Sequence, residues 1–126
     1  MDVFAVGRDG VPRVAWWHGE WNDWQPLGTY AFAPRTPITA LSRDSDWMDI
    51  FAVGTDGVVR VAWWHGNWND WQPIYSQKFQ PGTVVAAQSR NDDQMDLFAV
   101  GADGRVYSNW WHGEWHEWFP VGTHVF

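Results

Sequence analysis

Tryptophan recurs beside histidine and polar side chains in three similar stretches of the sequence. The stretches read WWHGEW at 16–21, WWHGNW at 63–68 and WWHGEW again at 110–115. An indole offers a flat apolar surface, while His, Asn and Glu supply hydrogen-bonding groups next to it. This combination suits a ligand with one apolar face and several hydroxyl groups, which is the chemistry of a sugar ring.

Two arginines add hydrogen-bond donors to this set. Arg43 and Arg90 each follow a serine, and a guanidinium can donate two parallel hydrogen bonds to neighbouring oxygens. The candidate carbohydrate-binding residues are therefore Trp17, His18, Glu20, Trp21, Arg43, Trp64, His65, Asn67, Trp68, Arg90, Trp111, His112, Glu114 and Trp115.

Each candidate also has a purely structural interpretation. His18 and its counterparts can be turn residues before glycine, because His tolerates unusual backbone angles. Arg43 and Arg90 can instead pair with the nearby Asp44 and Asp92, which is a surface contact of small value. Most tryptophans should be buried between sheets. The tryptophans expected to stay more exposed are Trp21, Trp68 and Trp115.

The sequence contains little that supports catalysis or metal binding. No serine stands in a nucleophile elbow, and no phosphate-binding loop is present. The acidic stretches 44–49 and 91–96 do not match the spacing of an EF-hand, and each His lacks a second ligand close by in the sequence. The residues at 20, 67 and 114 change between Glu and Asn, which indicates tuning of binding. We predict a protein that is not an enzyme and that uses no metal and no cofactor.

Composition narrows the possible partners. The 126 residues include 13 tryptophans, no cysteine, and a formal net charge of −7. Such an acidic chain repels phosphate backbones, so nucleic acid is not an expected partner. No run approaches the roughly 18 apolar residues of a membrane span, and the first residues lack the basic start and apolar segment of a signal peptide. We expect a soluble protein without membrane insertion, cytoplasmic or released by a route that needs no signal peptide.

The sequence repeats with a period of 47 residues. Met1, Met48 and Met95 each begin a segment of the form MDxFAVGxDG. Residues 1–47 and 48–94 are identical at 29 of 47 positions, and residues 95–126 match 1–32 at 19 of 32. The chain is therefore expected to be one domain, 1–126, made of two whole repeats and an incomplete third.

Each repeat predicts four short antiparallel strands. In the first repeat these strands lie at 1–6, 11–17, 20–26 and 37–42, separated by turns at Asp9-Gly10 and His18-Gly19. No segment has a sustained helical period. A four-stranded unit of this length in tandem is typical of a β-propeller blade, in which both sheet faces are covered by neighbouring blades. The predicted fold class is all-β, a β-propeller.

Counting strands indicates that the chain associates with itself. The order of strands gives one three-stranded blade and two four-stranded blades, whereas propellers typically have about 4–8 blades. An open stack would expose apolar sheet faces at both ends. We expect a homo-oligomer, with a dimer of nearly six blades favoured, provided that the absent first strands are supplied elsewhere or dispensed with. That the chain is a fragment or an engineered piece of a longer propeller stays open.

The stretch FAVGTDGVVRVAWWHGNWNDWQPI at 51–74 resembles the Photorhabdus-type β-propeller lectins. This resemblance extends over every repeat, and it implies binding of fucose or related sugars, including O-methylated ones, in shallow pockets between blades. The family carries seven blades in one chain, and this sequence provides fewer than three complete ones.

Two functions follow from these observations. The first is a non-catalytic, multivalent lectin whose partners are glycans. The second is a self-assembling propeller scaffold, natural or engineered, whose main property is a symmetric oligomer.

Overall fold

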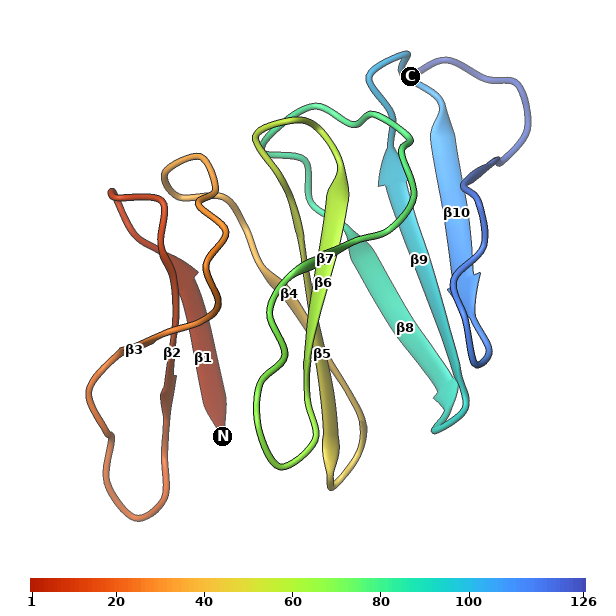
Figure 1. Cartoon of the computed structure of the whole chain (residues 1–126). Helices are drawn as coiled ribbons and strands as arrows, with labels where there is room; N and C mark the ends of the chain where they lie inside the picture. The colour runs from red at the N-terminus through yellow and green to blue at the C-terminus, as the bar shows by residue number, and fades with distance from the viewer.

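The computed structural model describes all 126 residues as three antiparallel sheets stacked in an arc (Figure 1). The sheets are three blades of a β-propeller. Blade 1 holds β1 (Asp2–Val6), β2 (Pro12–Trp16) and β3 (Gln25–Pro26). Blade 2 holds β4 (Thr39–Asp44), β5 (Trp47–Val53), β6 (Val59–Trp64) and β7 (Gln72–Pro73). Blade 3 holds β8 (Ala86–Asn91), β9 (Gln94–Val100), β10 (Val106–Trp111) and β11 (Phe119–Pro120).

The strand order confirms the predicted blade pattern. Neighbouring strands pair in the order β1-β2-β3, β4-β5-β6-β7 and β8-β9-β10-β11, always antiparallel. The turns are also confirmed, since Gly10 and Gly19 have positive φ angles of 79° and 83°. At the first turn the Asp9 carboxylate accepts the amide of Val11 at 3.1 Å, as Asp turn residues commonly do.

Two predicted strands differ in extent from the structure. The strand expected at 20–26 contains only Gln25–Pro26, because the side chains of Asn22 and Asp23 accept the backbone amides of Trp16 and Trp24 in place of backbone carbonyls. The strand expected at 37–42 runs from Thr39 to Asp44. It begins later because the Thr36 hydroxyl donates to the Ala33 carbonyl in a turn before the strand. It ends later because the turn to β5 takes only residues 45 and 46.

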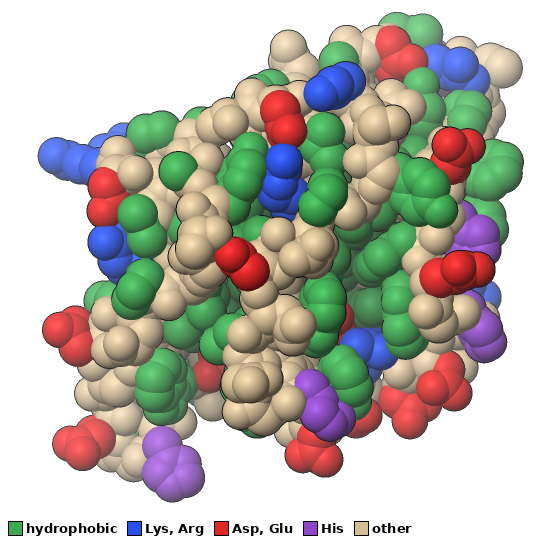
Figure 2. Space-filling model, in the orientation of Figure 1, with side chains coloured by type: hydrophobic (Ala, Val, Ile, Leu, Met, Phe, Trp, Pro, Cys, Tyr) green, Lys and Arg blue, Asp and Glu red, His purple; other side chains and the backbone are tan.

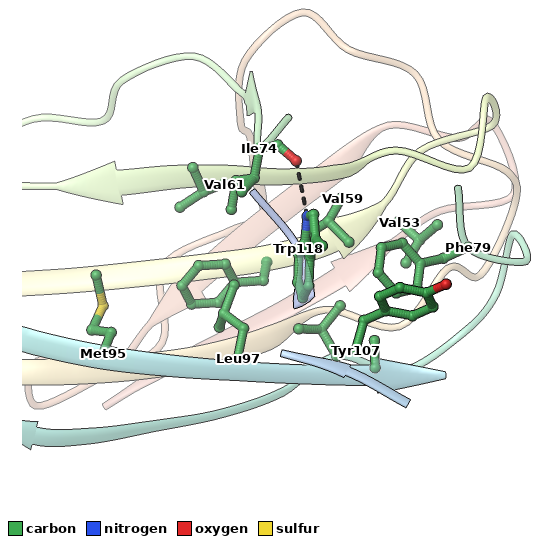
Figure 3. Close-up of a cluster of buried hydrophobic side chains, with 12 residues drawn as sticks. Val53, Val59, Val61, Ile74, Phe79, Met95, Leu97, Tyr107 and Trp118 are labelled. Atoms are coloured by element: carbon green, nitrogen blue, oxygen red, sulfur yellow. Dashed lines mark hydrogen bonds between the residues drawn. The ribbon is translucent and has the colours of Figure 1, made fainter. Parts of the chain in front are cut away.

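The core lies between the blades, not within them. One buried cluster joins blades 1 and 2, and a larger one joins blades 2 and 3 (Figure 3). Adjacent residues of β5 contribute to different clusters, since Ile50 packs toward blade 1 and Phe51 toward blade 3. Side chains of a strand alternate between its two faces. This explains why the strands read as apolar on both faces.

An indole hydrogen bond marks both blade boundaries. The Nε1–H of Trp71 donates to the carbonyl of Leu27 at 3.2 Å, and the Nε1–H of Trp118 donates to the carbonyl of Ile74 at 3.0 Å (Figure 3). The two bonds are related by the 47-residue period. Trp24 is the corresponding residue of the first repeat.

The expectation that most tryptophans are buried was wrong for the chain on its own. Only Trp71 and Trp118 are buried, and seven others are partly exposed. The space between blades is hollowed near one end, so several indoles line openings there. The four most exposed indoles all belong to blade 1, and they are Trp16, Trp17, Trp21 and Trp24.

Candidate functional site

Two pockets lie at equivalent positions, one at each boundary between neighbouring blades. The first lies between blades 1 and 2 and has a volume of about 520 Å³, and the second lies between blades 2 and 3 with about 370 Å³. Figure 2 shows hydrophobic side chains in the hollow between blades 2 and 3. Residue pairs 47 apart line both pockets: Asp2/Asp49, Val14/Val61, Trp16/Trp63, Gln25/Gln72, Pro26/Pro73, Met48/Met95, Trp64/Trp111 and Trp68/Trp115.

The paired tryptophans of each repeat serve different pockets. Trp63 and Trp64 are neighbours on β6, so their side chains point to opposite faces of blade 2. Trp64 lines the first pocket together with Trp16, and Trp63 lines the second together with Trp111. Each pocket is therefore walled by the first Trp of one blade and the second Trp of the next.

Arg43 lies at the side of the second pocket, where its side chain is 6% exposed. It is the extra residue of a β-bulge between β4 and β5, because the register shifts between Ser42 and Asp44. Its guanidinium carbon lies 4.6 Å from the ring of Trp47 and 4.6 Å from that of Trp111. This places the cation between two aromatic faces, one from each blade.

The hydrogen bonds of Arg43 leave donors unused. Nε donates to Asp49 at 2.8 Å, one terminal nitrogen donates to the second oxygen of Asp49, and the other donates to the Asp92 carbonyl. These are three of the five N–H groups of a guanidinium, so two stay free. Burial raises the pKa of Asp49, and the hydrogen bonds from Arg43 oppose that rise.

The predicted alternative pairings of the arginines were wrong. Arg43 pairs with Asp49 and not with Asp44, and Arg90 pairs with Asp96 at 2.9 Å and not with Asp92. The reason is the β-bulge, which recurs between Ser89 and Asn91 and turns each arginine toward the following strand.

Five of the sequence-predicted residues line the two pockets. Trp64 and Trp68 line the first, and Arg43, Trp111 and Trp115 line the second. His65 lies next to the pockets, because its ring packs 3.9 Å from that of Trp47.

The other predicted residues are not brought into either pocket. Trp17 and Trp21 pack against each other, with ring centroids 5.6 Å apart, on the exposed side of blade 1. Arg90 lies on the exposed side of blade 3. The remaining ones are exposed at the tips of the turns: His18, Glu20, Asn67, His112 and Glu114.

Sequence reasoning missed several residues that line the pockets. Trp16 and Trp63 are the first members of the tryptophan pairs, and alternation along the strand could have identified them. Gln25 and Gln72 stand beside the proline of the short third strand and supply side-chain amides. Trp47 has no aromatic counterpart in the other repeats, so the repeat pattern could not predict that it lines a pocket.

The structure has neither a cluster of metal-binding side chains nor a helix that could span a membrane. No three His, Asp or Glu side chains come together in an arrangement that could hold a metal ion. No helix has the length and apolar character needed to cross a membrane.

Comparisons with known proteins find similarity to solved structures alone. Neither a family model nor a curated protein sequence matches the chain. The six-bladed β-propeller lectin of Aleuria aurantia is similar with a TM-score of 0.76 and 20% identity, over 97% of this chain and 39% of that one. A triple arginine-to-alanine mutant of AofleA from Arthrobotrys oligospora is similar with a TM-score of 0.69 and 18% identity, over 91% and 35%.

One solved neighbour has nearly the same length as this chain. A fucose lectin from Kordia zhangzhouensis, solved with methyl-fucoside, is similar with a TM-score of 0.69 and 15% identity, over 99% of this chain and 90% of that one. The chain spans about two fifths of the length of the Aleuria lectin, a mutant of which was solved in complex with α-methyl-L-fucoside. At these identities the likeness shows the β-propeller fold. The narrower resemblance to Photorhabdus-type lectins stays a prediction.

Proposed function

We propose that the protein is a non-catalytic lectin that binds fucose or related sugars, including O-methylated ones, in its two inter-blade pockets. The observation that carries this proposal is the repetition of one lining, with two facing tryptophans, an amide and a carboxylate, at two boundaries 47 residues apart. Solved neighbours of the same fold are fucose-binding lectins, which supports the choice of sugar.

The pocket chemistry fits a deoxy sugar. Facing indoles offer surfaces against which the C–H face of a sugar ring and its methyl group can pack. In the second pocket the two free N–H groups of Arg43 and the amide of Gln72 would meet the hydroxyl groups. In the first pocket Gln25 and the hydroxyls of Ser42 and Ser45 would do so. Both volumes fall in the range of roughly 300–1,000 Å³ common for small-ligand sites.

Affinity for a glycan surface would come from repetition. A single open pocket holds a monosaccharide weakly, whereas several pockets fixed on one rigid stack raise the overall affinity without new contacts. We also propose that the protein is a homo-oligomer, which would multiply the sites further. The exposed aromatic residues of blade 1 support this second proposal.

Titration calorimetry with methyl α-L-fucoside tests the lectin proposal. We expect sugar binding by the wild-type protein and fewer sites per chain in Arg43→Ala, because the second pocket loses its donors. Arg13→Ala is the matched control, because Arg13 pairs with Asp9 at a turn and lines neither pocket. An absence of binding up to millimolar sugar, or equal loss of sites in both variants, would contradict the proposal.

A further inference from the structure

The aromatic contacts between blades follow the 47-residue period. At each boundary a Trp edge meets a Phe, a second Trp packs on another Phe, and that second Trp donates its Nε1–H to a backbone carbonyl. The contacts at the first boundary are Phe4–Trp68, Phe32–Trp71 and Trp71 to Leu27. Those at the second are Phe51–Trp115, Phe79–Trp118 and Trp118 to Ile74, with the added stack of Arg43 on Trp111.

Blade 3 carries one half of every such contact on its outer face. The residues one period further along are Phe98, Phe126, the carbonyl of Val121, and Arg90. They have no contact from a further blade, and Phe126 is accordingly 79% exposed where Phe79 is 2% exposed. The side chain of Arg90 is 56% exposed where that of Arg43 is 6% exposed.

The position of Phe126 matches that of its buried counterparts. Its amide donates to the Gly104 carbonyl at 2.8 Å, as Phe32 donates to Gly10 and Phe79 to Gly57. The backbone therefore holds this ring where the rings of Phe32 and Phe79 receive a tryptophan from the next blade.

Blade 1 carries the other half of every contact on its own outer face. Trp21 and Trp24 are the counterparts of Trp115 and Trp118, and Trp17 is the counterpart of Trp111. Trp24 is 43% exposed where Trp118 is 8% exposed, and Trp21 is 49% exposed. The two free faces of one chain thus have complementary halves of the same contact set.

We propose that blade 1 of a second copy docks on blade 3, so that two copies join head to tail. Trp24 of the second copy donates its Nε1–H to the Val121 carbonyl, Trp21 of the second copy packs on Phe98, and Trp17 of the second copy stacks on Arg90. Two copies bring six blades, which lies within the usual range for a closed ring, and the ring has two identical junctions. The proposed homo-oligomer is then a closed dimer with these contacts at each junction.

The junction also builds a third pocket that neither copy has alone. By the same period its walls are Arg90, Asp96, Trp110 and Phe119 from blade 3, with Trp17 and Trp21 of the second copy. Phe119 stands where the other pockets have Gln25 and Gln72, and it already stacks on Trp110 with ring centroids 5.5 Å apart. The composite pocket therefore takes the same sugar class with one amide fewer. This rests on the proposed lectin function.

Light scattering on the full chain tests the junction. We expect a particle of twice the chain mass of 14.6 kDa for the wild-type protein and a single chain for Trp24→Glu. Trp16→Glu is the matched control, because Trp16 is equally exposed but faces the first pocket, and it should keep the doubled mass. Circular dichroism checks that each variant folds. A wild-type monomer at all concentrations, or a dimer of folded Trp24→Glu, would overturn the proposal.

Mixing two variants distinguishes head-to-tail docking from contact between like faces. Phe98→Glu damages the outer face of blade 3, and Trp24→Glu damages that of blade 1, so each alone should be monomeric. Mixed, they retain one intact junction, and a one-to-one complex should form. If Phe98→Glu alone stays dimeric, the docking is not head to tail and the proposal fails.

Counting sugar sites separates the two proposals. With methyl α-L-fucoside we expect three sites per chain in the dimer and two in monomeric Trp24→Glu. A dimer without sugar binding overturns the lectin function and the composite pocket, and leaves the junction standing. A monomer with two sites overturns the junction and leaves the lectin function standing.

Discussion

At the scale of single residues, the turns show how one carboxylate can organise a hairpin. Asp9 accepts the amide of Val11 and two hydrogen bonds from Arg13. Asp56 does the same with Val58 and Arg60. These bonds favour the charged carboxylate, so they lower its pKa, with the arginine as the larger cause for both residues.

The lowered pKa values predict weaker folding in acid. The pKa of Asp9 falls to about 2 from its ordinary 3.8, and those of Asp70 and Asp103 are also lowered, by Thr29 and Tyr107 respectively. A carboxyl with a lower pKa in the folded state stabilises the fold above its ordinary pKa, and this stabilisation is lost as pH falls. We expect the thermal midpoint to drop between about pH 4.5 and pH 2.

The variant Asp9→Asn provides the comparison for this pH profile. Asn keeps an acceptor for the Val11 amide but cannot titrate. Its thermal midpoint should be lower than that of the wild-type protein at pH 6 and should fall less steeply in acid. Identical slopes for the two proteins would show that Asp9 has no part in the acid response.

Asn109 illustrates how a single substitution reshapes one repeat. It stands where the other repeats have Ala15 and Ala62, and its buried amide bonds both the N–H and the carbonyl of His116. In the first two repeats the matching backbone N–H donates to the carbonyl of Trp16 or Trp63. The side chain of Asn109 thus replaces a backbone acceptor.

We expect Asn109→Ala to lower the free energy of unfolding by about 1–3 kcal/mol, because it removes the buried amide that bonds the N–H and the carbonyl of His116. Urea denaturation measures this change. The reciprocal variant Ala62→Asn should also destabilise the fold, because repeat 2 offers this amide no matching partner. An unchanged stability of Asn109→Ala would contradict the assigned role.

Residue types predicted the turns well and the arginine pairs poorly. An Asp-Gly dipeptide between apolar runs carries its own local geometry, so the role of Asp9 could be read from the sequence. Arg43 pairs with Asp49 because of a β-bulge, and a bulge leaves no mark in the residue pattern. For the same reason the sequence did not show that Arg43 stacks between Trp47 and Trp111.

At the scale of elements, the blade boundary depends on the last, two-residue strand of each blade (β3, β7 or β11) and on the tryptophan just before it. The side chains of Trp71 and Trp118 reach the neighbouring blade. There they donate hydrogen bonds to the carbonyls of two buried residues, Leu27 and Ile74. The count of eleven strands could be predicted, because apolar runs and turn dipeptides alternate clearly. The length of β3 could not be predicted, because the side chains of Asn22 and Asp23 accept backbone amides that a longer strand would pair with carbonyls.

We expect Trp71→Phe to lower the free energy of unfolding by about 1–3 kcal/mol, because the Leu27 carbonyl loses its donor inside the boundary. Trp118→Phe should cost a similar amount. Trp16→Phe serves as the control, since its indole is exposed and makes no such bond, and its effect should stay within about 0.5 kcal/mol. Equal stability of all three variants in urea would rule out a structural role for the indole bond.

At the scale of the whole molecule, the stack of blades creates the pockets. No single blade contains a site, because each pocket takes one wall from each of two sheets. The 47-residue repeat predicted the stack, and its aromatic residues predicted a surface for sugars. Among the tryptophans of the predicted site, Trp64, Trp68, Trp111 and Trp115 line a pocket. Trp17 and Trp21 occupy the same positions in blade 1, but within one chain no blade faces them.

A crystal soaked with methyl α-L-fucoside locates the bound sugar. We expect a sugar ring in each inter-blade pocket, with its apolar face against Trp64 in the first and Trp111 in the second. We also expect hydroxyl oxygens of the second sugar within about 3.2 Å of the Arg43 guanidinium. If saturating sugar leaves both pockets empty, or binds only elsewhere on the surface, the protein does not bind fucose between its blades.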